Sequence, residues 1–335
     1  MPEAPEFLGT GDFDGDGHWD VIAAARGSEA LYLLPGDGRG GFGQAQRREL
    51  PGRVTALASG EINRADGLMD VVVGIVGKDG PQVLVFESPE GAFRAKPEAF
   101  ALPAAATALA LGQLDGDDPT DLAVAAGREL VIVHGRDRKL SLDGSKQAEV
   151  PPAIISRQSF SFTITAVAIG NFTSGHQAET ALLSADGTVH VMDRGVTAQR
   201  APAGKAGLRE SIAVTVPSFQ LSGLTASPSL LVPARVSSRP GADLIVVDAV
   251  NHQLHIIEGG MLAQAQQSAD AQRAMSEAVV TLDVEDEPVA VLPMRLNADA
   301  LSDLVVLIRW PRSIADGSAD GGSGHLHRQL DRRYR

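Results

Sequence analysis

Short apolar runs of four to six residues recur along the chain, separated by turns rich in glycine and acidic residues. Three such runs, 55–58, 71–76 and 82–86, follow one another within a single stretch, and comparable groups occupy the rest of the chain. Short strands at even spacing, with three or four in each group, are typical of β-propeller blades rather than of βαβ units. The one segment with helical composition is 261–277, for which the sequence predicts a helix.

An acidic residue stands directly before the second apolar run of each group, and this acid returns every 50 to 64 residues. Internal repeats of this length indicate an array of similar units. The repeats are centred near Asp20, Asp70, Asp121, Glu179, Asp243 and Asp303. The sequence therefore predicts an all-β chain that forms a β-propeller of about six to seven four-stranded blades. The sixth repeat ends after its second strand, so this prediction allows the last blade to be incomplete.

Residues 12–20 read DFDGDGHWD and place carboxylates at alternate positions on a turn containing Gly15 and Gly17. Calcium takes six to eight oxygen ligands, and glycine permits the backbone bends that aim several of them at one point. An EF-hand is excluded, because its closing glutamate would fall at Ala23. The alternative to a metal site is an Asp/Gly turn that merely caps a hairpin. The predicted calcium ligands are the side chains of Asp12, Asp14, Asp16 and Asp20, with the backbone carbonyl of His18.

The segment GDFDGDGHWDVIAAARG, followed by GDGRGGF, resembles the FG-GAP repeat of integrin-α propellers and its bacterial relatives, the VCBS repeats. Weaker copies cover about residues 6–310, so we assign 1–310 to the propeller and 311–335 to a disordered tail. The resemblance implies a calcium-binding recognition or adhesion module of a secreted or cell-surface bacterial protein. It further implies that the calcium is structural and that the partner is an extracellular protein or polysaccharide.

Carrying the loop over to the other repeats gives a graded series of sites. The third repeat keeps a weaker metal site, formed by Gln113, Asp115, Asp117 and Asp121. The second repeat is one residue longer than the pattern, and its doubtful metal site consists of Glu61, Asn63, Asp66 and Asp70. The fourth offers only Asn171, Thr173 and Glu179. In the fifth and sixth repeats Arg235 and Arg295 take the first position. Their charge opposes a cation and could pair with the remaining acids, so we expect these loops to hold no metal.

Composition limits the class of protein. A net charge of −13 argues against a nucleic-acid partner, because phosphate binding needs clustered Lys and Arg. The absence of cysteine excludes disulfides and cysteine-ligated metals. No apolar run has the length of a membrane span. The first six residues lack the features of a signal peptide, so we expect either an upstream leader or an exception to the extracellular family. The basic segment 325–335 prompts the hypothesis that the tail is a frameshifted part of a longer surface protein.

Two other functions stay open beside recognition. Propellers also host lyases or hydrolases around a central channel, and the chain could alternatively be a spacer within a large surface protein. No serine lies in a GxSxG elbow, and the glycine-rich segment 36–42 lacks the Lys-Ser/Thr of a phosphate loop and is predicted to be a hairpin turn. The sequence therefore assigns no catalytic residue.

Overall fold

A computed structural model of the chain describes residues 4–63, 66–138, 151–173, 178–192, 209–211, 218–220, 230–260 and 279–309. Within these ranges the only helical element is a 3-10 turn, η1 (Ala92–Arg94), and the regular structure is otherwise β-strand. The all-β prediction is confirmed. The predicted helix over 261–277 and the predicted disordered tail over 311–335 lie outside the described residues.

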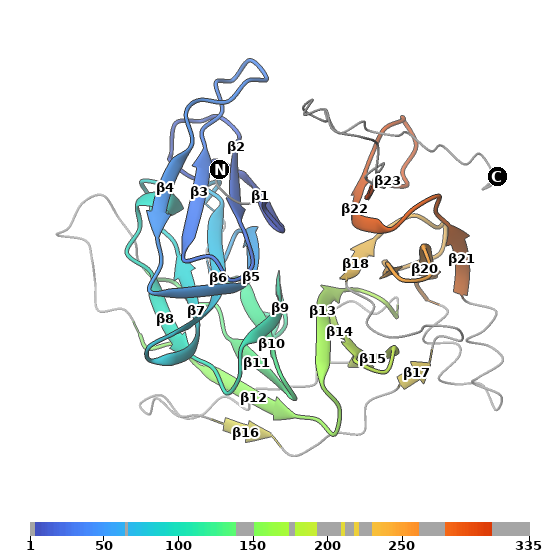
Figure 1. The fold of residues 1–335 in the computed structure, drawn as a ribbon. Coiled ribbons are helices and arrows are strands. Elements are labelled where there is room, and N and C mark those ends of the chain that lie inside the picture. Colours follow the sequence, from blue (N-terminus) through green and yellow to red (C-terminus); the bar gives the residue numbers. More distant parts are fainter. Residues whose placement is uncertain are drawn as a thin grey trace, which may run out of the picture. The chain divides into compact units, whose positions relative to one another are not determined.

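Three sheets follow one another in the first half of the chain, each with strands in chain order and antiparallel pairing (Figure 1). The first contains β1 (Phe7–Gly11), β2 (Asp20–Ala24), β3 (Ala30–Leu34) and β4 (Gln46–Glu49). The second contains β5 (Gly52–Gly60), β6 (Asp70–Gly77), β7 (Gly80–Phe86) and β8 (Glu98–Ala101). The third contains β9 (Ala106–Gly112), β10 (Asp121–Ala126), β11 (Glu129–Val133) and β12 (Ile155–Ser159), with β16 (Arg209–Ser211) added in parallel at its edge.

The same order continues further along the chain. The next sheet has the strand order β13-β14-β15-β17 and is formed by β13 (Ile164–Gly170), β14 (Glu179–Ser184), β15 (Thr188–Met192) and β17 (Ser218–Gln220). A further sheet contains β18 (Leu230–Ala234), β19 (Asp243–Asp248), β20 (Gln253–Ile257) and β21 (Val279–Asp283). The last two described strands, β22 (Pro288–Met294) and β23 (Asp303–Ile308), form a two-stranded sheet.

The repeat acids occupy one structural position. Each of the six begins the second strand of its sheet, that is β2, β6, β10, β14, β19 or β23. The apolar runs 55–58, 71–76 and 82–86 lie within β5, β6 and β7. The apolar pattern therefore places these three strands correctly, and the acid marks the start of the second strand in all six repeats.

The chain divides into two compact units, one made of Met1–Ile169 with Met192–Thr215 and the other of Gly170–Val191 with Val216–Arg335. The first unit contains the sheets β1–β4, β5–β8 and β9–β12, and the second contains the sheets β18–β21 and β22–β23.

The core of the first unit lies between successive sheets. Leu33 of β3 packs in one cluster with Val73 and Leu84 of the second sheet, and Val72 packs in another with Leu122 and Val131 of the third. The central strand β6 is buried on both faces over its first six residues, which explains why it reads as a continuous apolar run. The first strands of successive sheets also contact one another, β1 with β5 and β5 with β9.

Candidate metal centre

The acid that begins each second strand accepts backbone N–H groups from its own loop. Asp20 Oδ2 accepts from the amide of Phe13 at 2.9 Å, and Asp121 Oδ2 accepts from Leu114 at 2.8 Å. The same bond recurs in the other four repeats, from Ile62 to Asp70, Phe172 to Glu179, Val236 to Asp243 and Leu296 to Asp303. Most of these carboxyl groups are buried, with Asp121 and Asp243 at 0% exposure. The acid is thus a structural bracket that closes the loop, whether or not a metal binds there.

In three of the sheets, a glycine after the third strand donates a second backbone N–H to the acid that begins the second strand. Gly36, Gly135 and Gly259 each donate at 2.8 Å to the Oδ1 atom of Asp20, Asp121 or Asp243. A Cβ atom on these glycines would lie 2.1, 2.5 and 2.6 Å from the carbonyl oxygen of the residue that precedes the acid. Only glycine permits this approach of the two backbones.

The first loop brings three of its predicted ligands together. Asp12, Asp14 and Asp20 each offer a carboxylate oxygen, and these atoms lie within 4.8 Å of one another. Asp14 Oδ1 is buried and has no hydrogen-bond partner. Burial, followed by the charges of Asp20 and Asp16, raises the pKa of Asp14. A cation would offset this shift, because it would pair with an oxygen that has no hydrogen-bond partner.

The loop backbone has the conformation that the sequence indicates. Gly15 and Gly17 adopt φ values of 76° and 84°, and both donate their N–H groups to the Asp12 carboxylate, at 2.7 and 2.8 Å. Asp16 instead accepts from the amide of His18 at 2.8 Å and lies outside the three converging acids. Because a carboxylate oxygen has two lone pairs, Asp12 can accept these bonds and still bind a metal. The donor set, all oxygen, fits calcium.

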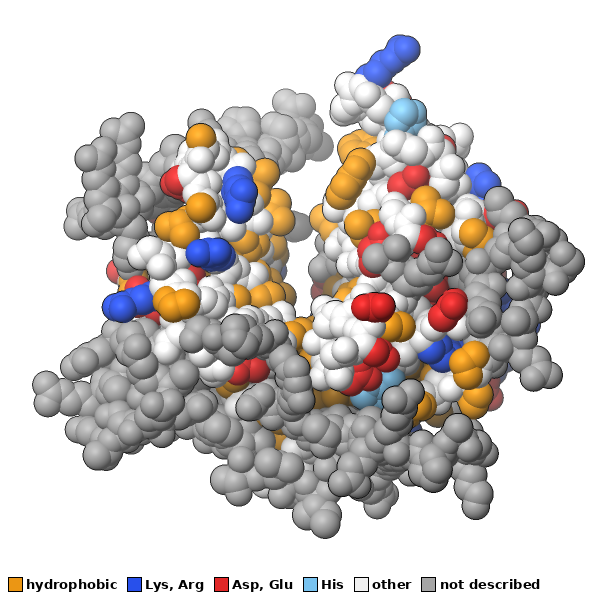
Figure 2. All heavy atoms as spheres, turned by 180° about the vertical axis from the view of Figure 1, so that it is seen from behind, with side chains coloured by type: hydrophobic (Ala, Val, Ile, Leu, Met, Phe, Trp, Pro, Cys, Tyr) orange, Lys and Arg blue, Asp and Glu red, His pale blue; other side chains and the backbone are white. Residues whose placement is uncertain are grey.

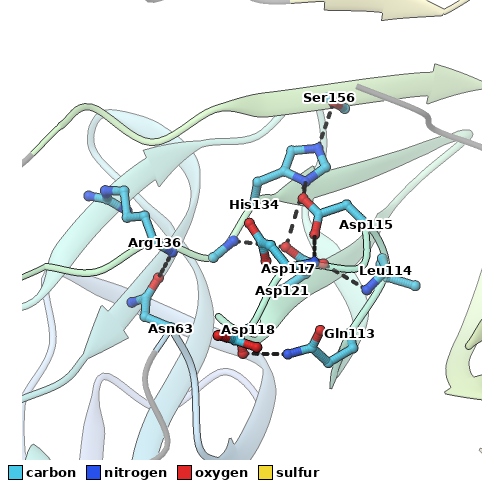
Figure 3. A network of polar contacts seen from close by, with 11 residues as sticks. Asn63, Gln113, Leu114, Asp115, Asp117, Asp118, Asp121, His134, Arg136 and Ser156 are labelled. Atoms are coloured by element: carbon cyan, nitrogen blue, oxygen red, sulfur yellow. Dashed lines mark hydrogen bonds and ion pairs between the residues drawn. The ribbon is translucent and has the colours of Figure 1, made fainter. Parts of the chain in front are cut away.

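The side chains that converge at the third loop differ from the predicted ligands (Figure 3). Asp115 and Asp121 converge with His134, with one ligand atom from each within 4.8 Å of the others. His134 Nδ1 lies 3.1 Å from Asp115 Oδ2 and 3.6 Å from Asp121 Oδ1. Burial acts to lower the pKa of His134, but contact with Asp121 and Asp115 outweighs it, so that the pKa is raised.

The other predicted ligands of the third loop lie at its edge. The Gln113 side chain donates to the backbone carbonyl of Asp118. Asp117 lies beside Asp115, and burial together with that neighbour raises the pKa of Asp117 to about 6. Of the four predicted ligands, Asp115 and Asp121 therefore converge here with His134, whereas Gln113 and Asp117 are not part of the converging group.

Sequence analysis missed His134, although the register of the strands locates it. Leu122 pairs with Val133, the last residue of β11, so His134, which follows it, lies opposite Asp121. The equivalent positions in the first, second and fifth sheets belong to Pro35, Glu87 and Glu258. In three of these sheets the residue directly precedes the bracket glycine, as in Pro35-Gly36, His134-Gly135 and Glu258-Gly259. A polar residue before that glycine is the signal that could have found it.

The second loop does not bring its predicted ligands together. Glu61 accepts from the amides of Asp66 and Gly67, and burial raises the pKa of Asp70 to about 9. Asn63 is buried, and its Nδ2 donates to Oε2 of Glu87, which follows β7 in the second sheet, at 2.7 Å. Its Oδ1 accepts from the amide of Arg136, which follows β11 in the third sheet, at 3.1 Å. Asn63 therefore joins two sheets, and among the described residues no converging group includes Asp70.

In the later loops, neutral side chains donate hydrogen bonds to the acid that begins the second strand. Thr173 and Ser237 donate their hydroxyl groups to Glu179 and Asp243, and the Asn297 amide donates to Asp303 at 3.2 Å. Within the described part of the chain, neither Arg235 nor Arg295 forms an ion pair with an acid of its own loop. The expectation that these arginines replace the metal by pairing is wrong, because the neutral donors already satisfy the acids.

No family model matches the chain, and no curated protein matches it in sequence. Among solved structures, it is similar to BBS1N in two crystal structures of its complex with ARL6DN. For the crystal soaked with lead the identity is 14% and the TM-score 0.44, over 93% of this chain and 94% of the other. For the crystal soaked with mercury the identity is 12% and the TM-score 0.46, over 92% and 90%. A humanized mutant of the Chaetomium thermophilum Polycomb Repressive Complex 2, bound to the inhibitor GSK126, is similar at 11% identity and a TM-score of 0.44, over 74% of this chain and 48% of the other.

The surface carries charged and apolar side chains side by side. Figure 2 shows acidic, basic and hydrophobic side chains interspersed on the face that it presents. Two large aromatic side chains near the first loop are exposed, Trp19 at 68% and Phe42 at 55%. In the ranges that the structure describes, no helix has the length and apolar character needed to cross a membrane.

Proposed function

We propose that the chain is a β-propeller recognition module of the FG-GAP type, stabilised by structural calcium and belonging to a secreted or cell-surface protein. The observation that carries this proposal is the convergence of Asp12, Asp14 and Asp20 around the buried, unpartnered Oδ1 atom of Asp14. Three carboxylates so close repel one another unless a cation lies between them. At a separation near 4 Å each pair costs about 1 kcal/mol in water and about 4 kcal/mol near a protein surface.

The arrangement of sheets supports a propeller. Five sheets of at least four strands follow one another along the chain, and in each of them successive strands pair as neighbours for three or four strands. In the first unit the contacts of β1 with β5 and of β5 with β9 are those expected where first strands line the inside of a ring. Blades built this way leave their connecting loops at the two ends of the ring, where binding surfaces form.

Calcium in this proposal orders a loop that presents contact residues. Trp19 lies between the ligand Asp20 and His18, and its carbonyl group packs against Gly36. Gly36 in turn forms a β-bridge with Phe42, so the two exposed aromatic residues belong to neighbouring segments. Exposed tryptophan and other aromatic side chains on ordered loops are typical of binding hot spots. An extracellular protein or polysaccharide is the partner we propose, and extracellular calcium is the metal.

The experiment compares thermal unfolding of wild-type protein and an Asp14→Asn variant, in calcium and in chelator. We expect the variant to lose the calcium-dependent rise in melting temperature. In chelator we expect it to melt at or slightly above the wild type, because it no longer carries a charge next to Asp16 and Asp20. The matched control is Asp79→Asn, the same change at an exposed acid in the turn between β6 and β7, which should leave both curves unchanged.

Equal loss of stability in calcium and in chelator would show that Asp14 stabilises the fold without a metal. A calcium response retained in the variant would show that calcium binds at a site other than the first loop. Either result contradicts a calcium site at the first loop. If the response is confirmed, extracellular proteins and polysaccharides can be screened for binding in calcium against chelator.

A further inference from the structure

The third loop contains a nitrogen ligand that a calcium loop would not need. His134 is 4% exposed, Asp121 is 0% exposed, and the ring of His134 lies between Ser156 on one side and the carboxylates of Asp115 and Asp121 on the other (Figure 3). These residues come from four places in the third sheet, namely the loop before β10, the start of β10, the position after β11, and β12. The cluster is therefore built by the fold and not by one acidic loop.

The contact of His134 with Ser156 orients the ring. His134 Nε2 lies 2.9 Å from the Ser156 hydroxyl oxygen, and Ser156 is fully buried. When Ser156 accepts the Nε2 hydrogen, Nδ1 presents a lone pair to Asp115 and Asp121. A lone pair facing two carboxylates requires a positive charge between them. Metal-binding histidines commonly have this outer hydrogen bond, which fixes the ring and its tautomer.

The distances agree with a small metal ion bound by nitrogen and oxygen. For tetrahedral zinc, with bonds of about 2.0–2.2 Å, neighbouring ligand atoms lie about 3.3–3.6 Å apart. The two distances from His134 Nδ1 to carboxylate oxygens are 3.1 and 3.6 Å. Both oxygens of Asp121 already accept a backbone N–H, from Leu114 and Gly135, and each keeps a lone pair for a metal.

The charges also favour a divalent ion over a proton. Two carboxylates, those of Asp115 and Asp121, contact one imidazole nitrogen. A protonated ring would offer them a single positive charge, whereas a divalent metal offers two. Calcium is disfavoured by the nitrogen ligand, because it binds oxygen almost exclusively, while imidazole suits zinc and its neighbours in the first transition series.

We propose that Asp115, Asp121 and His134 form a binding site for a zinc-class divalent transition metal, with Ser156 as the residue that positions the imidazole. The site is separate from the first loop and does not depend on calcium binding there.

Cobalt is the probe, because tetrahedral Co²⁺ absorbs visible light strongly and reports its ligands directly. The full chain, purified without a histidine tag and stripped of metal with chelator, is titrated with Co²⁺ and then with Zn²⁺ at neutral pH. We expect a saturable visible absorption that zinc abolishes. His134→Gln should lose it, while the matched control His252→Gln, the same change at a histidine in the turn between β19 and β20, should keep it. Ser156→Ala should weaken cobalt binding about tenfold.

Asp115→Asn provides a second test on an exposed residue, in case His134→Gln fails to fold. It should also lose the absorption while keeping the wild-type circular dichroism spectrum. The proposal is overturned if no saturable absorption appears, or if His134→Gln and Asp115→Asn both bind cobalt as the wild type does. Either result would leave His134 as a protonated partner of the two carboxylates. The calcium-dependent melt of the Asp14 variant is a different measurement, so each proposal can fail alone.

Discussion

Replacing Gly36 with alanine tests the hydrogen bond by which Gly36 holds Asp20, the acid that begins β2. The Gly36 amide donates to Asp20 Oδ1 at 2.8 Å, and a Cβ atom at this position would lie 2.1 Å from the carbonyl oxygen of Trp19 and 3.0 Å from its carbon. Both are backbone atoms, so no side chain can rotate away. The two segments must separate by about 1 Å or more to reach van der Waals distance, and the hydrogen bond to the buried Asp20 carboxylate breaks as they do.

Two contributions set the size of the effect. Loss of a hydrogen bond to a buried charged group costs about 1.5–3 kcal/mol. Forcing an extra methyl group into packed backbone costs about 1–3 kcal/mol more. Together we expect Gly36→Ala to lower the free energy of unfolding by about 2.5–6 kcal/mol. At about 2–4 °C per kcal/mol for a unit of this size, the melting temperature should fall by roughly 10 °C.

The assay is thermal unfolding by circular dichroism in chelator, with Gly40→Ala as the control. Gly40 has a φ of 90° and no atom within 4 Å of its Cβ position, so alanine there should cost only about 1–2 kcal/mol of backbone strain. In an Asp20→Asn background, Gly36→Ala should cost about 1–3 kcal/mol less than in the wild type, because the hydrogen bond is already impaired. Equal costs for Gly36→Ala and Gly40→Ala, or strict additivity with Asp20→Asn, would refute the bracket.

Two further pairs of substitutions extend these ideas to other residues of the first unit. Burial raises the pKa of Asp70 from 3.8 to about 9, so the ionised form is penalised in the folded state and stability in chelator should fall as the pH rises between those values. Asp70→Asn should therefore melt several degrees above the wild type near pH 8, and its melting temperature should depend less on pH. Asp121→Asn should melt below the wild type, because its single amide oxygen must accept two backbone N–H groups. Thermal unfolding at about pH 5 and at about pH 8 tests both expectations. Arg48 donates to the carbonyl groups of Phe93 and Ala95 and lies 4.5 Å from the centre of the Phe86 ring, so Arg48→Lys should cost about 1–2 kcal/mol in a chemical unfolding curve. The exposed pair of Arg47 with Glu49 makes Arg47→Lys the control, with a change below about 0.5 kcal/mol, and equal effects of the two would contradict the role given to Arg48.

The sequence predicts the strands of this fold well because its signal is local. Apolar runs such as 71–76 are buried on both faces, and the acid at the head of each run begins a strand in all six repeats. The role of that acid was harder to predict. A carboxylate before a strand suggests a metal ligand. The same acid also recurs in loops where its partner is neutral, as in Ser237 with Asp243, because it accepts backbone N–H groups from the loop in every repeat.

Residues that act between strands or sheets were less accessible to sequence analysis. His134 lies opposite Asp121 only because of the register between β10 and β11, and Asn63 leaves its loop to bond with Glu87 and the Arg136 amide of the next sheet. Side-chain direction within a loop was also hidden, since Gln113 and Asp16 have the right spacing for ligands but bond to nearby backbone groups. Spacing shows which residues share a loop, whereas hydrogen bonding decides which of them face the same point.

Calcium stabilisation of the wild-type chain is measured most directly by thermal unfolding in chelator, in rising calcium and in magnesium. Free calcium at a hundred times the dissociation constant adds about 2.7 kcal/mol for each site that exists only in the folded state. We expect a calcium-selective rise of several degrees from the site at Asp12, Asp14 and Asp20. A folded chain whose melting temperature is the same in chelator, calcium and magnesium would show that the first loop is an Asp/Gly turn alone, and would contradict the proposed calcium-stabilised module.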